Sequence, residues 1–200
     1  LQKIVVPYAA LHLHPGSHAG YYPGAKPIAL KIVFAPESGK LLGAQAVGAD
    51  GVDKRIDVLA TALKAGLTID ALAELELAYA PPYGSAKDPI NMAGMAAQNV
   101  RAGLMRVKQW YEVPGLDAAH YVLLDVRSAK EREAGAIPGS LHIPLDELRS
   151  RLDEVPRDRE VVVYCHSGQR SYNAARILAQ RGRTAWNLTG AYKTWKSAQP

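Results

Sequence analysis

The sequence predicts two domains in tandem, an α+β unit over residues 1–103 and an α/β unit with a parallel sheet over residues 107–200. In the first half, extended segments come first and helical ones follow, which is the order typical of α+β folds. In the second half, β and α segments alternate with short connections, which favours a parallel sheet. The glycine-containing segment 101–106 lies between the halves and is the expected linker.

Antiparallel strands are expected at the start of the first half. Residues 1–8 read as a strand, and the glycine- and proline-rich stretch 12–24 reads as a loop. Segments 27–35 and 41–47 should form a hairpin across the turn Pro36–Gly39. The first of these two segments carries alternating apolar residues on one face, namely Ile28, Leu30, Ile32 and Phe34.

Three helices are expected after these strands. The first spans 52–64 and ends at Gly66, a short second helix follows the N-cap Thr68, and the third runs from Asp88-Pro89 through Ala102. The apolar stripe of the first helix comprises Val52, Ile56, Leu59, Ala60 and Leu63. The third helix is thin and suits close approach to another backbone, for example across a dimer, because of its small residues Ala93, Gly94, Ala96, Ala97 and Gly103.

Strands and helices alternate in the second half. The expected strands are 107–113, 121–126, 141–144, 161–164 and 184–188. Helices are expected at 145–152, after the loop that follows Cys165, and around Tyr192 and Trp195. We expect Asp125 and Arg127 to tie neighbouring loops at a strand end. Trp186 and Trp195 are expected in the core.

The only cysteine of the chain, Cys165, marks the candidate catalytic site. It ends a β-branched strand and is followed by the loop His166 to Arg170, after which Ser171 is expected to cap a helix. Free backbone N–H groups and a helix N-terminus favour an anion here, whether a thiolate, a persulfide or an oxyanion. Gly168 permits a positive φ, and Arg170 adds a cation at the rim. The pattern indicates a nucleophilic thiol.

Two other interpretations of this cysteine stay open. A lone cysteine at a strand end is often a small buried hydrophobic residue. Cysteine-based phosphatases use the same device for phosphate, but their loops usually hold one residue more between cysteine and arginine. Here only His166, Ser167, Gly168 and Gln169 intervene, which suits a single sulfur atom better, and no general-acid aspartate follows the loop. Sulfur transfer is favoured, with arsenate or phosphate chemistry as the alternative.

Composition narrows the function classes. The chain is 48% apolar and 22% charged, as is ordinary for a globular protein. It has no signal peptide and no apolar run near the ~18 residues of a membrane span, so no membrane partner is expected. A net charge of +5 without a basic run and interleaved aromatics argues against nucleic acid. One cysteine fits a reducing cytoplasm. The opening on Leu1, in an expected strand, predicts a part of a longer protein.

Three histidines of the first half raise the question of a metal site. His12, His14 and His18 lie in a glycine- and proline-rich stretch without a cysteine or acid nearby. This spacing is a weak signal for zinc, so no metal ion is expected.

Four long motifs of the first half carry a family resemblance. They are H-A-G-Y-Y-P-G-A-K-P-I, L-L-G-A-Q-A-V-G, G-V-D-K-R-I-D-V-L-A-T-A and L-A-Y-A-P-P-Y-G-S-A-K-D-P-I-N-M-A-G. Together they resemble the C-terminal dimerisation domain of coenzyme A disulfide reductases, which are pyridine nucleotide-disulfide oxidoreductases. The resemblance implies a homodimer through residues 1–103, in which Tyr21 and Tyr79 reach the partner subunit's active site near the coenzyme A sulfur. Tyr22 and Tyr83 are the alternative matches.

The flavin and nucleotide domains of that family, with their glycine-rich fingerprint and redox cysteine, lie upstream of the region that these motifs cover. None of those features is found in this chain. The resemblance therefore implies FAD, NAD(P)H and coenzyme A for the full-length protein, and no cofactor bound by this chain alone.

The second half resembles another family. The motifs D-V-R-x-x-x-E, G-x-I-P-G, C-x-x-G-x-R-S and N-L-T-G-A-Y-x-x-W, in this order, resemble a single-domain rhodanese, a sulfurtransferase. The resemblance implies that Cys165 carries a persulfide, that the amides of His166 to Ser171 cradle it, and that Arg170 fixes the loop and the anionic donor. One small departure is Ala136, where the family commonly has histidine.

The two resemblances together imply the C-terminal part of a coenzyme A disulfide/persulfide (polysulfide) reductase. Its rhodanese domain is expected to move sulfane sulfur from coenzyme A persulfide, polysulfide or thiosulfate to a thiol acceptor through Cys165. A stand-alone thiosulfate sulfurtransferase and a non-enzymatic dimerising scaffold are the alternatives. The complete C-x-x-G-x-R loop argues against the scaffold.

Overall fold

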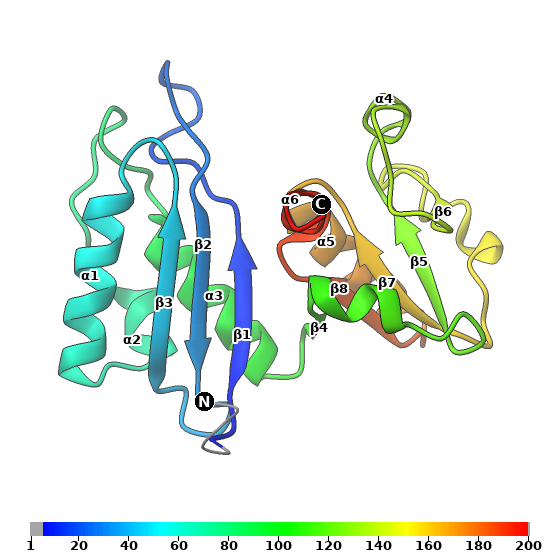
Figure 1. The fold of residues 1–200 in the computed structure, drawn as a ribbon, viewed down its shortest axis with the longest axis horizontal. Coiled ribbons are helices and arrows are strands. Elements are labelled where there is room, and N and C mark those ends of the chain that lie inside the picture. The colour runs from blue at the N-terminus through cyan, green and yellow to red at the C-terminus, as the bar shows by residue number, and fades with distance from the viewer. Residues whose placement is uncertain (1–5, 200) are drawn as a thin grey trace. The chain divides into compact units, whose positions relative to one another are not determined.

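The computed structural model describes residues 6–199 and divides the chain into two compact units, the first ending at Ala102 and the second beginning at Gly103 (Figure 1). The first unit holds a three-stranded antiparallel sheet in the order β1-β2-β3, followed by helices. Its elements are β1 (Ala9–Leu13), β2 (Ala29–Phe34), β3 (Leu41–Val47), α1 (Val52–Ala65), α2 (Ile69–Glu74) and α3 (Pro89–Arg101). This arrangement confirms the α+β prediction.

The hairpin of β2 and β3 follows the sequence pattern closely. Alternate residues of its first strand, Leu30, Ile32 and Phe34, are buried, so the pattern of period two predicts the core face correctly. The prediction of a strand at 1–8 is wrong for residues 6–8, which are irregular, because pairing with β2 begins only at Ala9. Residues 1–5 of that prediction lie outside the described residues. The predicted loop 12–24 starts too early, since β1 runs through Leu13.

Helix α1 turns a different face to the core from the one predicted. Its buried residues are Arg55, Leu59 and Ala62, whereas Ala60 is exposed. The Arg55 guanidinium donates to both carboxylate oxygens of Asp88, at 3.3 and 2.7 Å, and both side chains are almost fully buried. Counting apolar residues along the helix does not identify this face, because an arginine paired with a carboxylate can be buried, whereas an unpaired arginine cannot.

The helix termini of the first unit agree with their capping signals. Gly66 ends α1 with φ 70°, and the Thr68 hydroxyl accepts the Ala71 amide at the start of α2. Asp88 caps α3 by accepting the Ile90 amide at 3.1 Å.

Close backbone packing in the first unit occurs between α2 and α3. A Cβ placed on Gly94 would lie 2.5 Å from the backbone nitrogen of Ala73 and 2.7 Å from the carbonyl oxygen of Ile69. The small residue therefore admits α2 of the same unit, and the expectation that it serves contact across a dimer is wrong for Gly94. Sequence identifies a thin helix but does not identify the neighbour.

The second unit is built on a five-stranded parallel sheet in the order β4-β8-β7-β5-β6 (Figure 1). This confirms the predicted α/β class. Its strands are β4 (Arg106–Lys108), β5 (Tyr121–Asp125), β6 (Leu141–His142), β7 (Glu160–Tyr164) and β8 (Ala185–Leu188). Its helices are α4 (Ala129–Glu133), α5 (Gln169–Ala179) and α6 (Ala191–Ser197), with 3₁₀ turns η2 (Trp110–Gly115) and η3 (Leu152–Glu154).

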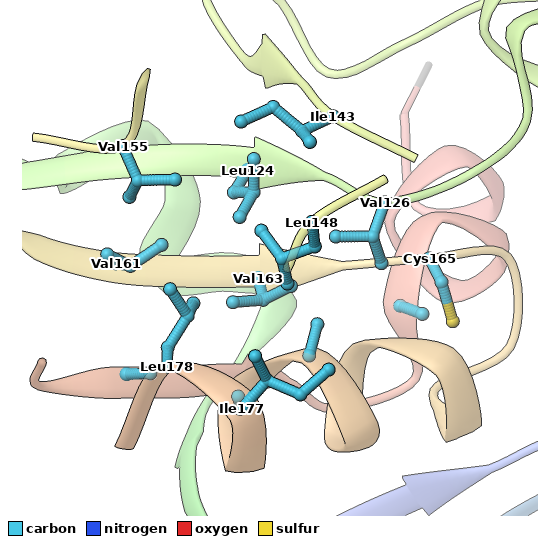
Figure 2. Packing of buried hydrophobic residues seen from close by; sticks show 14 residues of the cluster. Leu124, Val126, Ile143, Leu148, Val155, Val161, Val163, Cys165, Ile177 and Leu178 are labelled. Carbon is cyan, nitrogen blue, oxygen red and sulfur yellow. The ribbon is translucent and has the colours of Figure 1, made fainter. Parts of the chain in front are cut away.

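The central strand β7 buries both of its faces. Val161 and Val163 pack in a cluster with Ile177 and Leu178 of α5, and Cys165 lies at the edge of this cluster, at the carboxyl end of the strand (Figure 2). Val162 and Tyr164 pack on the opposite face with residues of η2 and α6. Trp186 and Trp195 pack against that second cluster and are half-buried, so their core prediction holds in part. The fully apolar run of β7 is the expected pattern for a parallel sheet covered on both faces.

Three local predictions for the second unit are wrong. The strand predicted at 107–113 shortens to β4 and continues as η2. The helix predicted at 145–152 is a series of turns with i→i+3 hydrogen bonds, such as Leu148 N–H to Leu145 at 3.2 Å. The stretch lies between Pro144 and Pro156, neither of which can donate a backbone hydrogen bond. Gly168, not Ser171, is the N-cap of α5.

Neither a membrane-spanning helix nor a metal-binding cluster is found among residues 6–199. Among residues 6–199, no helix combines the length and apolar character needed to cross a membrane. Over the same residues, no group of three or more His, Cys, Asp or Glu side chains could hold a metal ion. His12 itself lies in β1, where burial lowers the pKa of its imidazole to about 4, with a further contribution from Lys31.

Candidate active site

Cys165 is the first residue after β7 and is only 1% exposed. The carboxyl end of a parallel sheet is where α/β folds commonly place their reactive groups. Helix α6 fixes the start of the loop, because the amide of Tyr192 donates to the Cys165 carbonyl at 3.0 Å and that of Lys193 to the His166 carbonyl at 3.1 Å. The loop carbonyls are thereby held by α6 rather than by solvent.

The Cys165 sulfur accepts a hydrogen bond from the loop backbone. The Gly168 amide donates to Sγ at 3.1 Å, and Gly168 has φ 113°, a value that favours glycine. Because Gly168 is the N-cap of α5, the amides of Gln169, Arg170 and Ser171 occupy the first helical turn, where no intrahelical acceptor exists. Together with the helix dipole, these amides create an environment that stabilises negative charge on sulfur.

Two buried side chains, those of Ser171 and Asn187, hydrogen-bond to the loop at the Gly168 carbonyl. The Ser171 hydroxyl lies 2.6 Å from Oδ1 of Asn187, 3.0 Å from the Gly168 carbonyl and 3.5 Å from Sγ of Cys165. The Asn187 side-chain amide also faces the Gly168 carbonyl, at 3.4 Å. Sequence reasoning assigned Ser171 a capping role and missed Asn187, although Asn187 opens one of the motifs that indicated the family.

Arg170 is held by a carboxylate from another helix. Its two terminal nitrogens donate to the two oxygens of Glu131 at 2.7 and 2.6 Å, across 39 residues of sequence. This bidentate contact lowers the pKa of Glu131 to about 2, with help from Ser128. The pKa of Arg170 is raised, first by its hydrogen bonds to Glu131 and also by its interaction with Cys165. Arg170 therefore couples the sulfur to α4.

Glu131 is fixed independently at the N-terminus of α4. Its carboxylate accepts the Ser128 amide at 3.1 Å and the Ser128 hydroxyl at 3.0 Å, which completes a capping box. Sequence reasoning gave Glu131 no role. Its place in the D-V-R-x-x-x-E motif was the available signal.

Asp125 and Arg127 tie the loops around the site, as expected. Arg127 donates to Asp125 at 2.9 and 2.7 Å and to the Gly135 carbonyl at 2.8 Å. Burial raises the pKa of Asp125, but the hydrogen bonds from Arg127 outweigh burial and hold the pKa below its ordinary value. The Arg127 guanidinium also lies 4.0 Å from the Tyr192 ring centre, which attaches α6 to this network.

The charged groups near the loop are mostly basic. Burial lowers the pKa of His166, and the charges of Lys193, Arg127 and Arg170 lower it further, while Glu131 acts in the opposite direction. His166 is therefore neutral near physiological pH. Of these cations, Arg170 also interacts with Cys165 and so favours an anionic sulfur species there.

Tyr21 and Tyr79 of the first unit form a hydrogen-bonded pair. Their hydroxyl groups lie 2.7 Å apart across 58 residues of sequence, and the side chains are 76% and 48% exposed. The hydrogen bond to Tyr79 raises the pKa of Tyr21. Tyr22 and Tyr83 are also exposed. The structure brings the predicted pair together, and its role in catalysis stays a prediction.

The residues of this chain do not fit a site for FAD or NAD(P)H. A dinucleotide phosphate in a parallel α/β sheet is held by a glycine-rich turn after a strand. Here the turn after β7 is the compact Cys165 loop, in which the Gly168 amide already binds Sγ, and the sequence holds no G-x-G-x-x-G motif.

Each unit matches the model of a known protein family. Residues 2–89 match the model of the pyridine nucleotide-disulphide oxidoreductase dimerisation domain, and residues 112–198 match the model of the rhodanese-like domain. The coenzyme A disulfide reductase of Staphylococcus epidermidis is 50% identical over 91 residues, which are 46% of this chain and 21% of that protein.

Two solved structures match nearly the whole chain. One is reduced CoADR-RHD from Bacillus anthracis, with 48% identity and a TM-score of 0.95 over 98% of this chain and 35% of that chain. The other is an NAD-dependent persulfide reductase from A. fulgidus, with 42% identity and a TM-score of 0.86 over 97% of this chain and 35% of that chain. The chain thus spans between 21% and 35% of these relatives.

Proposed function

Since the chain joins a pyridine nucleotide-disulfide oxidoreductase dimerisation domain to a rhodanese-like domain, we propose that it works as the sulfur-transferring C-terminal part of a coenzyme A disulfide or persulfide reductase. The two family-model matches confirm both resemblances that the sequence motifs indicate. The observation that carries the proposed chemistry is the Sγ of Cys165, held at the carboxyl end of β7 by the Gly168 amide at 3.1 Å.

Sulfur transfer proceeds in two displacements. The Cys165 thiolate attacks the outer sulfur of a donor R–S–SH, the bond between the two donor sulfurs breaks, and RS⁻ leaves with its electron pair. The Cys165 persulfide then presents its own outer sulfur to an acceptor thiolate, and the Cys165 thiolate is regenerated. Each step exchanges one S–S bond for another, so no oxidant or reductant is consumed. This is the two-step pattern of covalent catalysis.

The loop stabilises the anionic sulfur in both displacements. The Gly168 amide donates to Sγ, and we expect the amides of His166 and Ser167 in the loop, and of Gln169, Arg170 and Ser171 in the first turn of α5, to act with it. A donor that is already oriented in a water-poor site contributes about 3 kcal/mol, by analogy with oxyanion holes. Arg170 supplies the fixed cation, and its pKa is raised first by its hydrogen bonds to Glu131 and also by its interaction with Cys165.

The wider role follows from the relatives. The persulfide reductase from A. fulgidus is named as NAD-dependent, and the full-length protein would use FAD and NAD(P)H to reduce coenzyme A disulfide, coenzyme A persulfide or polysulfide. The first unit forms the homodimer and places Tyr21 and Tyr79 near the coenzyme A sulfur of the partner subunit's active site. Cys165 as a free thiol suits a reducing cytoplasm.

The thiocyanate assay tests the sulfurtransferase activity of this chain. The purified chain is incubated with thiosulfate and cyanide, with polysulfide as a second donor, and Cys165→Ser is run in parallel. Thiocyanate from the wild type and none from Cys165→Ser supports the proposal. An inert wild type with both donors contradicts it and favours the scaffold. Circular dichroism checks that the variant is folded, since the chain offers no second cysteine as a matched control.

A further inference from the structure

We propose that Glu131 is a positioning residue which acts through Arg170 as an anion filter, so that the Cys165 site takes sulfur from persulfides of organic thiols in preference to small dianions such as thiosulfate. The inference rests on the proposed sulfur-transfer function and deepens it by naming the class of donor. It concerns a carboxylate that the displacement steps themselves do not use.

The carboxylate of Glu131 occupies the position where a small anion would bind Arg170. Both of its oxygens engage the two terminal guanidinium nitrogens at 2.6 and 2.7 Å, the paired geometry that a sulfonate or phosphate would adopt. Ser128 holds the same carboxylate through its amide and its hydroxyl. An incoming anion therefore meets a planar fork that is already filled from a fixed helix terminus.

Among the charged groups near the loop, Glu131 is the one that discriminates between sulfur donors by their negative charge. The charged groups that act on the loop residue His166 are the bases Lys193, Arg127 and Arg170 and one acid, Glu131. Arg127 is already neutralised by Asp125, its buried partner at 2.7 Å. Arg170 interacts with Cys165 and is paired with the Glu131 carboxylate. The negative charge of Glu131 therefore repels a donor with two negative charges more strongly than a donor with one.

The two donor classes place different demands on Arg170. With thiosulfate, the Cys165 thiolate takes the outer sulfur and sulfite leaves with two negative charges, so the dianion must displace Glu131 from Arg170 or lie beside it. With an organic hydropersulfide, the Cys165 thiolate takes the outer sulfur, and the leaving thiolate carries a single negative charge on its sulfur. The second reaction needs only that the outer sulfur reaches Sγ, so Glu131 opposes it less.

Steady-state kinetics of Glu131→Gln with the two donors test the filter, using thiosulfate and glutathione persulfide with cyanide as acceptor. Gln keeps the length of the side chain and removes the charge. We expect the KM for thiosulfate to fall about tenfold and the KM for glutathione persulfide to change less than about twofold. Glu133→Gln is the matched control, because it removes the same charge from an exposed position of α4 and should change neither KM.

A second variant keeps the test decisive if the first folds poorly. Glu131→Asp retains the charge, shortens its reach to Arg170 and should lower the KM for thiosulfate by a smaller factor, again with little effect on the persulfide. Equal changes for both donors would reduce Glu131 to a structural role, and an unchanged thiosulfate KM in both variants would overturn the proposal. Failure of the wild type with both donors would instead contradict sulfur transfer itself.

Discussion

Among the single residues of the site, Glu131 connects Arg170 to the N-terminus of α4. It completes the capping box of α4 with Ser128 and holds both terminal nitrogens of Arg170. Its pKa falls to about 2 for this reason, with Arg170 as the first cause. A carboxyl group whose pKa is lower in the folded chain than in the unfolded chain stabilises the fold only while it is charged.

The pH dependence of stability should therefore change when Glu131 is replaced. Near neutral pH, Glu131→Gln should lower the free energy of unfolding by about 1 kcal/mol, a value reduced for the partial exposure of the pair. This difference from wild type should shrink as the pH falls from the ordinary value of 4.5 toward the folded value of about 2, because protonation then removes the wild-type charge as well. Urea unfolding over a pH series measures it, with Glu133→Gln as control. A difference independent of pH would contradict the account.

The tyrosine pair gives a second prediction at this scale. The hydrogen bond between the hydroxyls of Tyr21 and Tyr79 raises the pKa of Tyr21, so Tyr79→Phe should return Tyr21 toward its ordinary titration. NMR of the labelled ring carbons across the alkaline range resolves individual tyrosines, and Tyr83→Phe is a matched control because Tyr83 is exposed and lies in the same loop as Tyr79. The Tyr21 titration should be unaffected in that control. An unchanged Tyr21 in Tyr79→Phe would show that the two hydroxyls do not interact in solution.

The motifs predicted individual residues of the candidate site but not the residues that hydrogen-bond to them. Cys165, Gly168 and Arg170 were predicted from one short loop, because the chemistry of a strand end followed by a helix N-terminus is local. Glu131 and Asn187 were missed, since their contacts cross 39 and 16 residues of chain. A single sequence does not reveal such distant pairs, even where both residues belong to recognised motifs.

At the scale of the elements, α2 and α3 of the first unit come close together at Gly94. The neighbouring atoms are backbone atoms of Ala73 and Ile69, which have little freedom to move aside. A side chain here would force the helices apart, and interiors as dense as protein cores do not absorb such a change without cost.

Replacing Gly94 tests this packing. Gly94→Ala should lower the free energy of unfolding by about 2 kcal/mol, because overpacking outweighs the better helix propensity of alanine, worth about 1 kcal/mol. Urea unfolding followed by circular dichroism measures the loss. Gly20→Ala is the control, since a Cβ there would meet nothing within 4 Å. A stabilised Gly94→Ala variant would show that α2 and α3 are not in close contact.

Elements with strong local signals were predicted closely. The β2–β3 hairpin follows its alternation, and α1 to α3 follow their caps at Gly66, Thr68 and Asp88. The wrong elements had weaker signals. The predicted helix at 145–152 has apolar spacing but forms only successive turns, and the buried face of α1 depends on Asp88, the partner of Arg55, which lies 33 residues away.

At the scale of the whole molecule, the chain joins two units for which we propose different functions. The first unit carries the exposed tyrosine pair, and residues 2–89 match the model of a dimerisation domain. The second unit carries the thiol with its loop donor, and residues 112–198 match the rhodanese-like model. The combination supports the proposal that the second unit transfers sulfur while the first joins two subunits.

Mass spectrometry of Cys165 after a single turnover tests the central claim most directly. The chain is mixed with one equivalent of glutathione persulfide, alkylated and digested, and the peptide that contains Cys165 is weighed. The account predicts the added mass of one sulfur atom on wild-type Cys165, lost on adding an acceptor thiol, and no such addition in Cys165→Ser. A wild-type peptide that gains no sulfur from the persulfide donor would contradict the assignment of Cys165 as the sulfur carrier.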